Sequence, residues 1–433
     1  MRYYLRNPKT KVVTPGSLLP PALQRDTELY ARISRMCTLR ETMRERLKAQ
    51  SKAEDFSKIN TVLSAIQDYL DELHWYLSYY EANQEAFKDM ASVDFIWKSA
   101  IAGKLHDAMG LARARYNMRT GGDSDGGMGG AVAGLGSRIL GSRGSKQRRT
   151  QSTSIYMELG FTLLALAIAK SMSAYSKVAT LDTEVECETI TAMTPGSFSG
   201  SAEEGEHGVE ALKRASIELR ESAGIFQYII DNVLPHLRGI RLSVPDLTPD
   251  IQYMLQMLSL ADSDRLSVRV WLRTDKNLKK SPNMPANLLL GIQERYSNAV
   301  TALRTLQSGE FRSVSADIQN YMSDGQMVIL AQAMVYLAQV HSDNQRYGNA
   351  VGFMRDARNL LADVKKRNNS VHARTADMLL RGPLDPLYSL YRRNNDAIGF
   401  EPVPTSEELQ AKLPSGRALV SRAIQYSPPS PLL

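Results

Sequence analysis

Cysteine and histidine are scarce in this sequence, which limits the chemistry that it can support. Its 433 residues include two cysteines, Cys37 and Cys187, and six histidines. No histidine is spaced from another histidine or from a cysteine as metal ligands are, and the zinc-binding HExxH pattern is missing. Two distant thiols are typical of a reducing compartment. Cys37 lies on the apolar side of an expected helix, so we expect a buried, inert thiol and no metal site.

A phosphate-binding loop is also missing, although glycine is abundant between residues 119 and 152. The run from Gly136 to Arg143 has the first glycine spacing of such a loop but lacks the Lys-Ser/Thr pair that contacts phosphate and magnesium. The basic clusters are not interleaved with aromatic residues, and no nucleic-acid recognition motif occurs. We therefore expect no cofactor, no nucleic-acid partner and no enzymatic activity.

Long hydrophobic runs are absent as well. The strongest one, Leu159–Ala169, is shorter than the roughly 20 residues that a membrane-spanning helix needs, so we interpret it as a buried central helix. The chain begins without the apolar core of a signal peptide and ends without a lipidation cysteine, so we expect neither signal. The net charge of +7 is interspersed with acidic residues, which is typical of an ordinary solvated surface. A basic face for anionic lipid or an acidic partner is the alternative.

Helical periodicity is what the sequence has in abundance. Strict strand alternation is missing, except for a possible short strand at residues 397–403. Two polar segments, at about 119–152 and 184–208, are too rich in small and charged residues to supply a core and are interpreted as low-complexity insertions. The pattern predicts an all-α fold with helices at about 26–50, 55–80, 95–118, 152–180, 209–238, 249–272, 285–307, 312–340 and 347–368.

Residues 329–364 are the most informative stretch. Apolar residues recur at helical spacing on both sides of a polar break at residues 342–345. This pattern is typical of a helical hairpin of the tetratricopeptide type, which must stack on neighbouring hairpins to bury its apolar face. Such stacks usually bind peptides rather than catalyse reactions. Small residues stand where the two helices would touch: Ala331, Ala338, Ala350 and Ala357.

The C-terminal part resembles the end of the Bro domain of the Alix family. Four short elements follow one another there: DPLY at 385–388, RRNND at 392–396, FEPVP at 400–404 and LPSGR at 413–417. The central stretch at 258–299 also resembles the partner-binding helices of that family. The resemblance implies an elongated, boomerang-shaped helical solenoid with a tetratricopeptide-like core. It implies a single domain over residues 1–420, which contains both insertions, and a short Pro-rich tail at 421–433.

This resemblance implies a non-catalytic scaffold that binds the C-terminal helix of the core ESCRT-III filament subunit. The FEPVP and LPSGR elements are most similar to the short family members of fungal ambient-pH signalling. They imply a role in alkaline-pH signalling, with a signalling protease or arrestin-like components as further partners. They also imply recruitment from the cytoplasm to endosomal or plasma membrane. The alternatives are a generic tetratricopeptide-like adaptor for another peptide, or a peripheral membrane protein that acts through a basic surface.

The resemblance also places a furrow for the partner helix on the helix that opens at Pro285. Each apolar side chain proposed for it can equally belong to the core, and Pro282 and Pro285 depart from the uninterrupted helix of the family. A charged rim would face an acidic partner helix, although exposed charges contribute little affinity. The predicted furrow residues are Leu266, Val268, Met284, Leu288 and Ile292, and the predicted rim residues are Lys276, Lys279 and Lys280.

Overall fold

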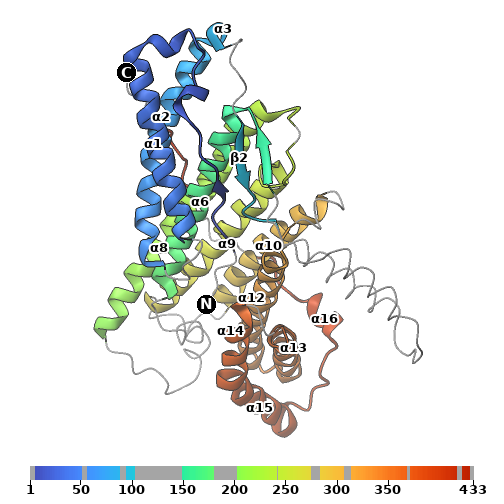
Figure 1. Cartoon of the computed structure of the whole chain (residues 1–433). Helices are drawn as coiled ribbons and strands as arrows, with labels where there is room; N and C mark the ends of the chain where they lie inside the picture. Colours follow the sequence, from blue (N-terminus) through green and yellow to red (C-terminus); the bar gives the residue numbers. More distant parts are fainter. Residues whose placement is uncertain are drawn as a thin grey trace, which may run out of the picture.

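The chain folds into long helices that are stacked one against the next in an elongated arrangement (Figure 1). A computed structural model describes residues 5–50, 56–87, 94–102, 149–179, 202–240, 242–274, 283–306, 314–367, 371–416 and 422–429. The predicted all-α fold is confirmed, with one small sheet as an addition. Of the two expected insertions, residues 119–148 and 184–201 lie outside the described residues.

Successive helices pack on one another, as a solenoid requires. Contacts join each of the long helices to the next one along the described chain, and α14 continues the stack after α13. Short helices follow at α14 (Val371–Leu379), α15 (Asp385–Asn394) and α16 (Ser406–Gln410). The long helices are α1 (Thr27–Gln50), α2 (Ile59–Ala82), α6 (Ile155–Ala179), α8 (Ala202–Tyr228), α9 (Pro249–Thr274), α10 (Asn283–Thr305), α12 (Ala316–Asp343) and α13 (Tyr347–Lys365).

The predicted helical hairpin at residues 329–364 is confirmed. Helices α12 and α13 pack together and are joined by a tight turn, in which Gln345 has a φ of 61°. The amide of Arg346 donates a hydrogen bond to the carbonyl of His341 across this turn. All four alanines at the predicted contact positions are fully buried, so small side chains let the two helices approach closely.

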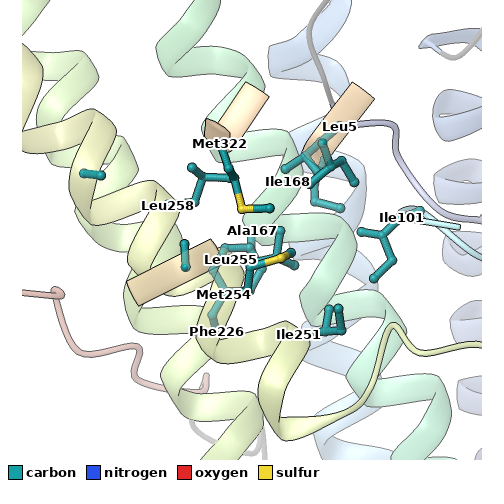
Figure 2. Close-up of a cluster of buried hydrophobic side chains, with 14 of the residues drawn as sticks. Leu5, Ile101, Ala167, Ile168, Phe226, Ile251, Met254, Leu255, Leu258 and Met322 are labelled. Carbon is teal, nitrogen blue, oxygen red and sulfur yellow. The ribbon is translucent and has the colours of Figure 1, made fainter. Parts of the chain in front are cut away.

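Helix α6 forms the centre of the core. It is the described helix that is long and apolar enough to cross a membrane, but 89% of its most apolar window is buried inside the fold. Its side chains therefore pack on other helices, as the interpretation of residues 159–169 predicts. Figure 2 shows Ala167 and Ile168 of α6 among side chains of α8, α9 and α12, including Phe226, Met254, Leu258 and Met322.

A three-stranded antiparallel sheet corrects two predictions. Strand β2 (Phe95–Lys98) pairs with β1 (Lys9–Thr10) on one side and with β3 (Arg149–Ser152) on the other. The helix predicted from residue 95 and the insertion predicted up to residue 152 are therefore wrong at these positions. Strands this short carry too few alternating residues to be recognised, and their partners lie far away in the sequence.

Two further boundaries differ from the sequence-based expectation. Residues 202–208, expected within the second insertion, belong to the first turns of α8. The short strand expected at 397–403 is absent from the described chain. In its place, a π-helical turn (Asn395–Gly399) follows α15, and Phe400 adopts a left-handed conformation with a φ of 48°.

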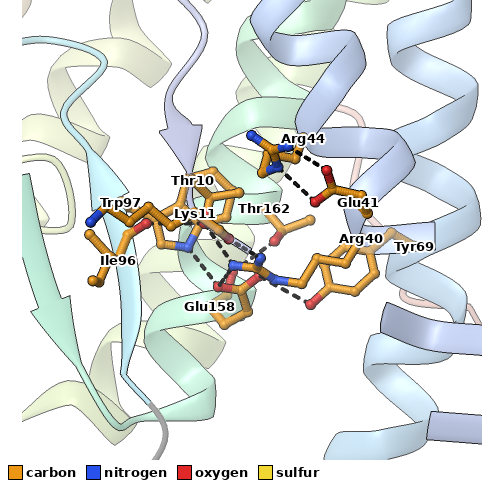
Figure 3. Close-up of polar contacts among 10 residues, drawn as sticks. All are labelled: Thr10, Lys11, Arg40, Glu41, Arg44, Tyr69, Ile96, Trp97, Glu158 and Thr162. Carbon is orange, nitrogen blue, oxygen red and sulfur yellow. Dashed lines mark hydrogen bonds and ion pairs between the residues drawn. The ribbon is translucent and has the colours of Figure 1, made fainter. Parts of the chain in front are cut away.

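A buried ion pair joins the sheet to the first helices (Figure 3). The carboxylate of Glu158 on α6 accepts hydrogen bonds from Arg40 Nε at 2.8 Å and from Trp97 Nε1 at 2.6 Å. Tyr69 of α2 donates a third, at 3.0 Å, and Arg40 Nη2 reaches Thr10 Oγ1 at 2.7 Å. Burial, reinforced by the charge of Glu158, raises the pKa of Tyr69, which keeps its hydroxyl a donor. The two charges therefore hold α1, α2, α6 and the sheet together.

Candidate functional site

The structure places the predicted furrow residues on α9 and α10, but mostly in the core. Leu288 and Ile292 of α10 are only 3% and 1% exposed, and Val268 of α9 is equally buried. Leu266 packs in a separate small cluster between α6, α8 and α9. Met284, in the first turn of α10, is half-buried against the main core. Met284 is therefore the accessible member of the predicted furrow, and the furrow itself stays a prediction.

The predicted charged rim lies outside the described residues. Lys276, Lys279 and Lys280 fall between the end of α9 and the start of α10, in the interval 275–282. The charged rim therefore stays a prediction.

A polar cluster fixes α10 against its neighbours. Tyr296 of α10 donates a hydrogen bond to Asp262 of α9 at 2.5 Å, and Tyr321 of α12 donates to the same carboxylate at 3.0 Å. Arg265 donates to the hydroxyl of Tyr296 at 3.3 Å. Burial and the charge of Asp262 raise the pKa of Tyr296, so its hydroxyl remains a donor. These hydrogen bonds therefore tie α10, as a platform, to both α9 and α12.

The described residues contain no cluster of side chains that would bind a metal ion. No group of three His, Cys, Asp or Glu side chains among them is placed to hold a metal ion. Cys37 is buried, and burial raises the pKa of its thiol to about 11, so it is not a thiolate at neutral pH. This geometry agrees with the expected inert thiol.

The burial of His74 on α2 should make the stability of the fold depend on pH. Its Nε2 has no hydrogen-bond partner, and burial lowers its pKa to about 4. Between that value and the ordinary pKa of about 6.5, the unfolded chain binds a proton that the folded chain does not. The free energy of unfolding therefore falls as the pH falls through this window.

Replacing His74 by glutamine removes this loss. On moving from pH 8 to pH 5, His74→Gln should gain about 2 kcal/mol of unfolding free energy relative to the wild-type chain. Urea denaturation at both pH values measures the difference, and the exposed His236→Gln serves as the control for losing a histidine. Identical pH dependence of the wild-type and His74→Gln proteins would contradict this account.

An open cavity of about 610 Å³ lies between α13, α15 and the turn that precedes α15. Five cationic side chains line it, which invites comparison with the predicted basic surface. Each of them, however, is paired with a nearby aspartate, so the local charge is nearly balanced and the basic-surface alternative gains little. The pairs are Arg355–Asp356, Arg358–Asp385, Lys365–Asp377, Lys366–Asp363 and Arg381–Asp377.

Sequence reasoning missed several exposed apolar residues in and after α15, which we together call the Phe400 surface. Phe400 is 77% exposed, although the Asn395 side chain bonds both the amide and the carbonyl of Glu401 and so fixes the turn. No periodicity reveals such a turn in the sequence, because it depends on one side chain that closes a loop. The surface consists of Leu390, Ile398, Phe400 and Val403.

Sequence reasoning also missed the path of the last residues. The amide of Ile424 donates a hydrogen bond to the carbonyl of Arg220 at 3.0 Å, and Arg220 Nε donates to the carbonyl of Arg422 at 2.9 Å. The ring of Tyr426 packs edge-on against Tyr228, with centroids 5.0 Å apart. Residues 422–429 therefore lie along α8 instead of leaving the domain.

The family of this helical stack follows from a sequence comparison. The model of the BRO1-like domain matches residues 197–428, which is more than half of the chain. The chain belongs to the BRO1-like domain family. The match includes α9, α10, the hairpin of α12 and α13, and the C-terminal segment on α8. The domain boundaries expected at residues 1–420 remain a prediction.

Solved BRO1 structures share the fold. A complex of the ALIX BRO1 domain with CHMP4C is similar with a TM-score of 0.63 at 15% identity, covering 98% of this chain and 96% of that chain. ALIX bound to a viral late-domain peptide is similar with a TM-score of 0.63 at 15% identity, covering 99% of this chain and 49% of that chain. A Bro1 domain described for endosomal targeting is similar with a TM-score of 0.61 at 12% identity, covering 98% of this chain and 93% of that chain.

Proposed function

We propose that this BRO1-like chain is a non-catalytic scaffold that binds the C-terminal amphipathic helix of the core ESCRT-III filament subunit. The observation that carries the proposal is the family match, which spans α9 and α10. One structural relative is described as a complex with CHMP4C, so that relative binds an ESCRT-III subunit.

The binding mode that this architecture favours is a helix laid along α10. An amphipathic helix binds a groove through apolar residues at i, i+3, i+4 and i+7, and a few of these anchors carry most of the free energy. Met284, Leu288 and Ile292 are spaced i, i+4 and i+8 on α10, about one turn apart, with Met284 the accessible one. The polar cluster of Asp262 and Tyr296 keeps this platform rigid, which lowers the entropy cost of binding.

We further propose that the chain acts in ambient-pH signalling, as a scaffold similar to PalC. The FEPVP and LPSGR elements at 400–404 and 413–417 support this assignment. The partners would then include a signalling protease or arrestin-like components, and the chain would be recruited from the cytoplasm to endosomal or plasma membrane. A related Bro1 domain is described for endosomal targeting, which agrees with such recruitment.

Titration of the full chain with a synthetic ESCRT-III C-terminal helix tests the scaffold proposal. We expect binding with a dissociation constant in the micromolar range, measured by calorimetry. The matched control is the same peptide with its apolar anchors changed to serine, which should not bind. Absence of binding by the unaltered peptide would contradict the proposal. Binding of the full chain to anionic liposomes at low salt that is lost at high salt would instead favour the peripheral membrane alternative.

A further inference from the structure

The C-terminal segment crosses three helices of the stack at glycines. We call residues 402–416 and 422–429 the strap. A Cβ atom added to Gly352 of α13 would lie 2.7 Å from Leu409 Cδ1. A Cβ atom added to Gly416 of the strap would lie 2.6 Å from the amide nitrogen of Gly291 on α10. On α8, a Cβ atom at Gly224 would lie only 1.7 Å from the carbonyl oxygen of Ile424. The strap therefore lies directly on the backbone of α10 and α8.

The first part of the strap is firmly anchored on α13. Leu409 is fully buried, and Thr405 forms a capping box with Glu408 at the start of α16. Arg355 of α13 donates a hydrogen bond to the carbonyl of Pro404 at 3.0 Å. Ser406 donates to the carboxylate of Asp356 at 2.9 Å. Residues 402–410 therefore behave as part of the fold.

The second part is held more lightly. Its contacts with α8 include the two hydrogen bonds that involve Arg220, the approach of the Ile424 carbonyl to Gly224 and the edge-on packing of Tyr426 on Tyr228. A hydrogen bond contributes only a modest net free energy, because it replaces a hydrogen bond to water, and an aromatic pair adds little beyond its buried area. Several of its side chains, including Gln425 and Pro428, are exposed. Release of this part is therefore less costly than opening any helix of the stack.

The strap meets α10 on the stripe that the proposed furrow uses. Met284, Leu288 and Gly291 are spaced i, i+4 and i+7, so they lie along one side of α10. Seven residues of helix span about 10 Å, and a helix with its side chains is about 10–12 Å wide. A partner helix that covers Met284 and Leu288 for more than two turns therefore reaches the backbone of Gly416. The strap and the partner helix compete for the same length of α10.

We propose that the strap is an intramolecular competitor that keeps the α10 face partly closed until a partner helix displaces it. The inference rests on the proposed function, because it names what restrains that same site. In the resting chain Gly416 lies against the backbone of Gly291, on the same side of α10 as accessible Met284. The apparent affinity is then lowered by the fraction of chains in which the strap is seated.

Gly224→Ala tests the competition without touching α10. The three atoms nearest to the added methyl group all belong to Ile424 and Tyr426 of the strap, so the substitution dislodges the strap and leaves α8 intact. Tyr426→Ala loosens the same contact from the other side, and exposed Gln425→Ala is the matched control. We expect the first two full-length variants to bind the ESCRT-III helix peptide about fivefold more tightly than the wild-type chain, and Gln425→Ala to match the wild type. Unchanged or weaker binding by both variants would overturn the proposal.

A second readout separates this inference from the proposed function. Hydroxyl-radical footprinting of the free chains reports the solvent access of residues 284–292 without any peptide. Higher reactivity of this stretch in Gly224→Ala than in Gln425→Ala supports the strap as its cover. If that rise occurs while no chain binds the peptide, the proposed ESCRT-III partner is wrong. The result would still support the strap as the cover of residues 284–292. Equal reactivity in the two variants overturns the strap proposal, whatever the peptide does.

Discussion

Replacing Glu158 by glutamine should lower the free energy of unfolding by about 3–5 kcal/mol. The substitution leaves the Arg40 guanidinium buried without its counter-charge, since the side chains of Arg40 and Glu158 are only 2% and 0% exposed. It also weakens the acceptor of the Trp97 and Tyr69 hydrogen bonds, which tie the sheet and α2 to α6. Chemical denaturation followed by circular dichroism measures the loss.

Glu41→Gln is the matched control, because it makes the same change in another Glu–Arg pair of the chain. Glu41 pairs with Arg44 on the same helix and is 36% exposed, so its loss should cost less than about 1 kcal/mol. Equal effects of the two substitutions would show that the buried pair has no special role. Replacing both Arg40 and Glu158 by apolar residues should recover part of the loss and not all of it. Trp97 and Tyr69 would still lack an acceptor in such a double variant.

Met284→Asp should weaken binding of the ESCRT-III helix peptide by at least about 30-fold, which corresponds to a loss of about 2 kcal/mol or more. A charge at the accessible end of the proposed furrow would have to be buried under the partner helix without a counter-ion. Because Met284 is half-buried in the first turn of α10, the fold should tolerate the substitution. Calorimetric titration, with circular dichroism as the folding check, measures the effect.

Met284 suits this experiment better than Leu288, because Met284 is partly accessible. Leu288 is almost fully buried, so an aspartate there would disrupt the core and abolish binding for a trivial reason. Leu390→Asp provides the matched control, because Leu390 is an exposed apolar residue of the Phe400 surface on α15. It should leave the affinity unchanged. Loss of binding in Leu390→Asp together with normal binding in Met284→Asp would move the site from α10 to the Phe400 surface.

Helical periodicity predicted most of the stack, because long amphipathic helices repeat their signal over many turns. The alanines of α12 and α13 show how far this extends, since each one is fully buried, as its spacing predicts. The sheet was not predicted, because β2 has only four residues and its register depends on partners about 50 to 90 positions away. Local pattern reading carries no information about such pairs.

The candidate site was harder to predict for a related reason. The sequence places Met284, Leu288 and Ile292 on one face of α10, but it does not show which of them other parts of the chain cover. The strap illustrates the difficulty: residues 422–429 have no periodicity, and the contacts of Ile424 and Tyr426 with α8 span about 200 positions. Whether an apolar helix face is core or furrow depends on such long-range contacts.

Photo-cross-linking of the helix peptide to the full chain tests the central claim most directly. The peptide would carry a photoreactive group at one of its apolar anchors, and mass spectrometry would map the cross-links on the wild-type chain. We predict cross-links to the N-terminal half of α10, around Met284, and to the strap residues that border Gly291. Cross-links confined to the Phe400 surface would contradict the account. A pattern in which α9, α10 and the strap carry no cross-link would contradict it as well.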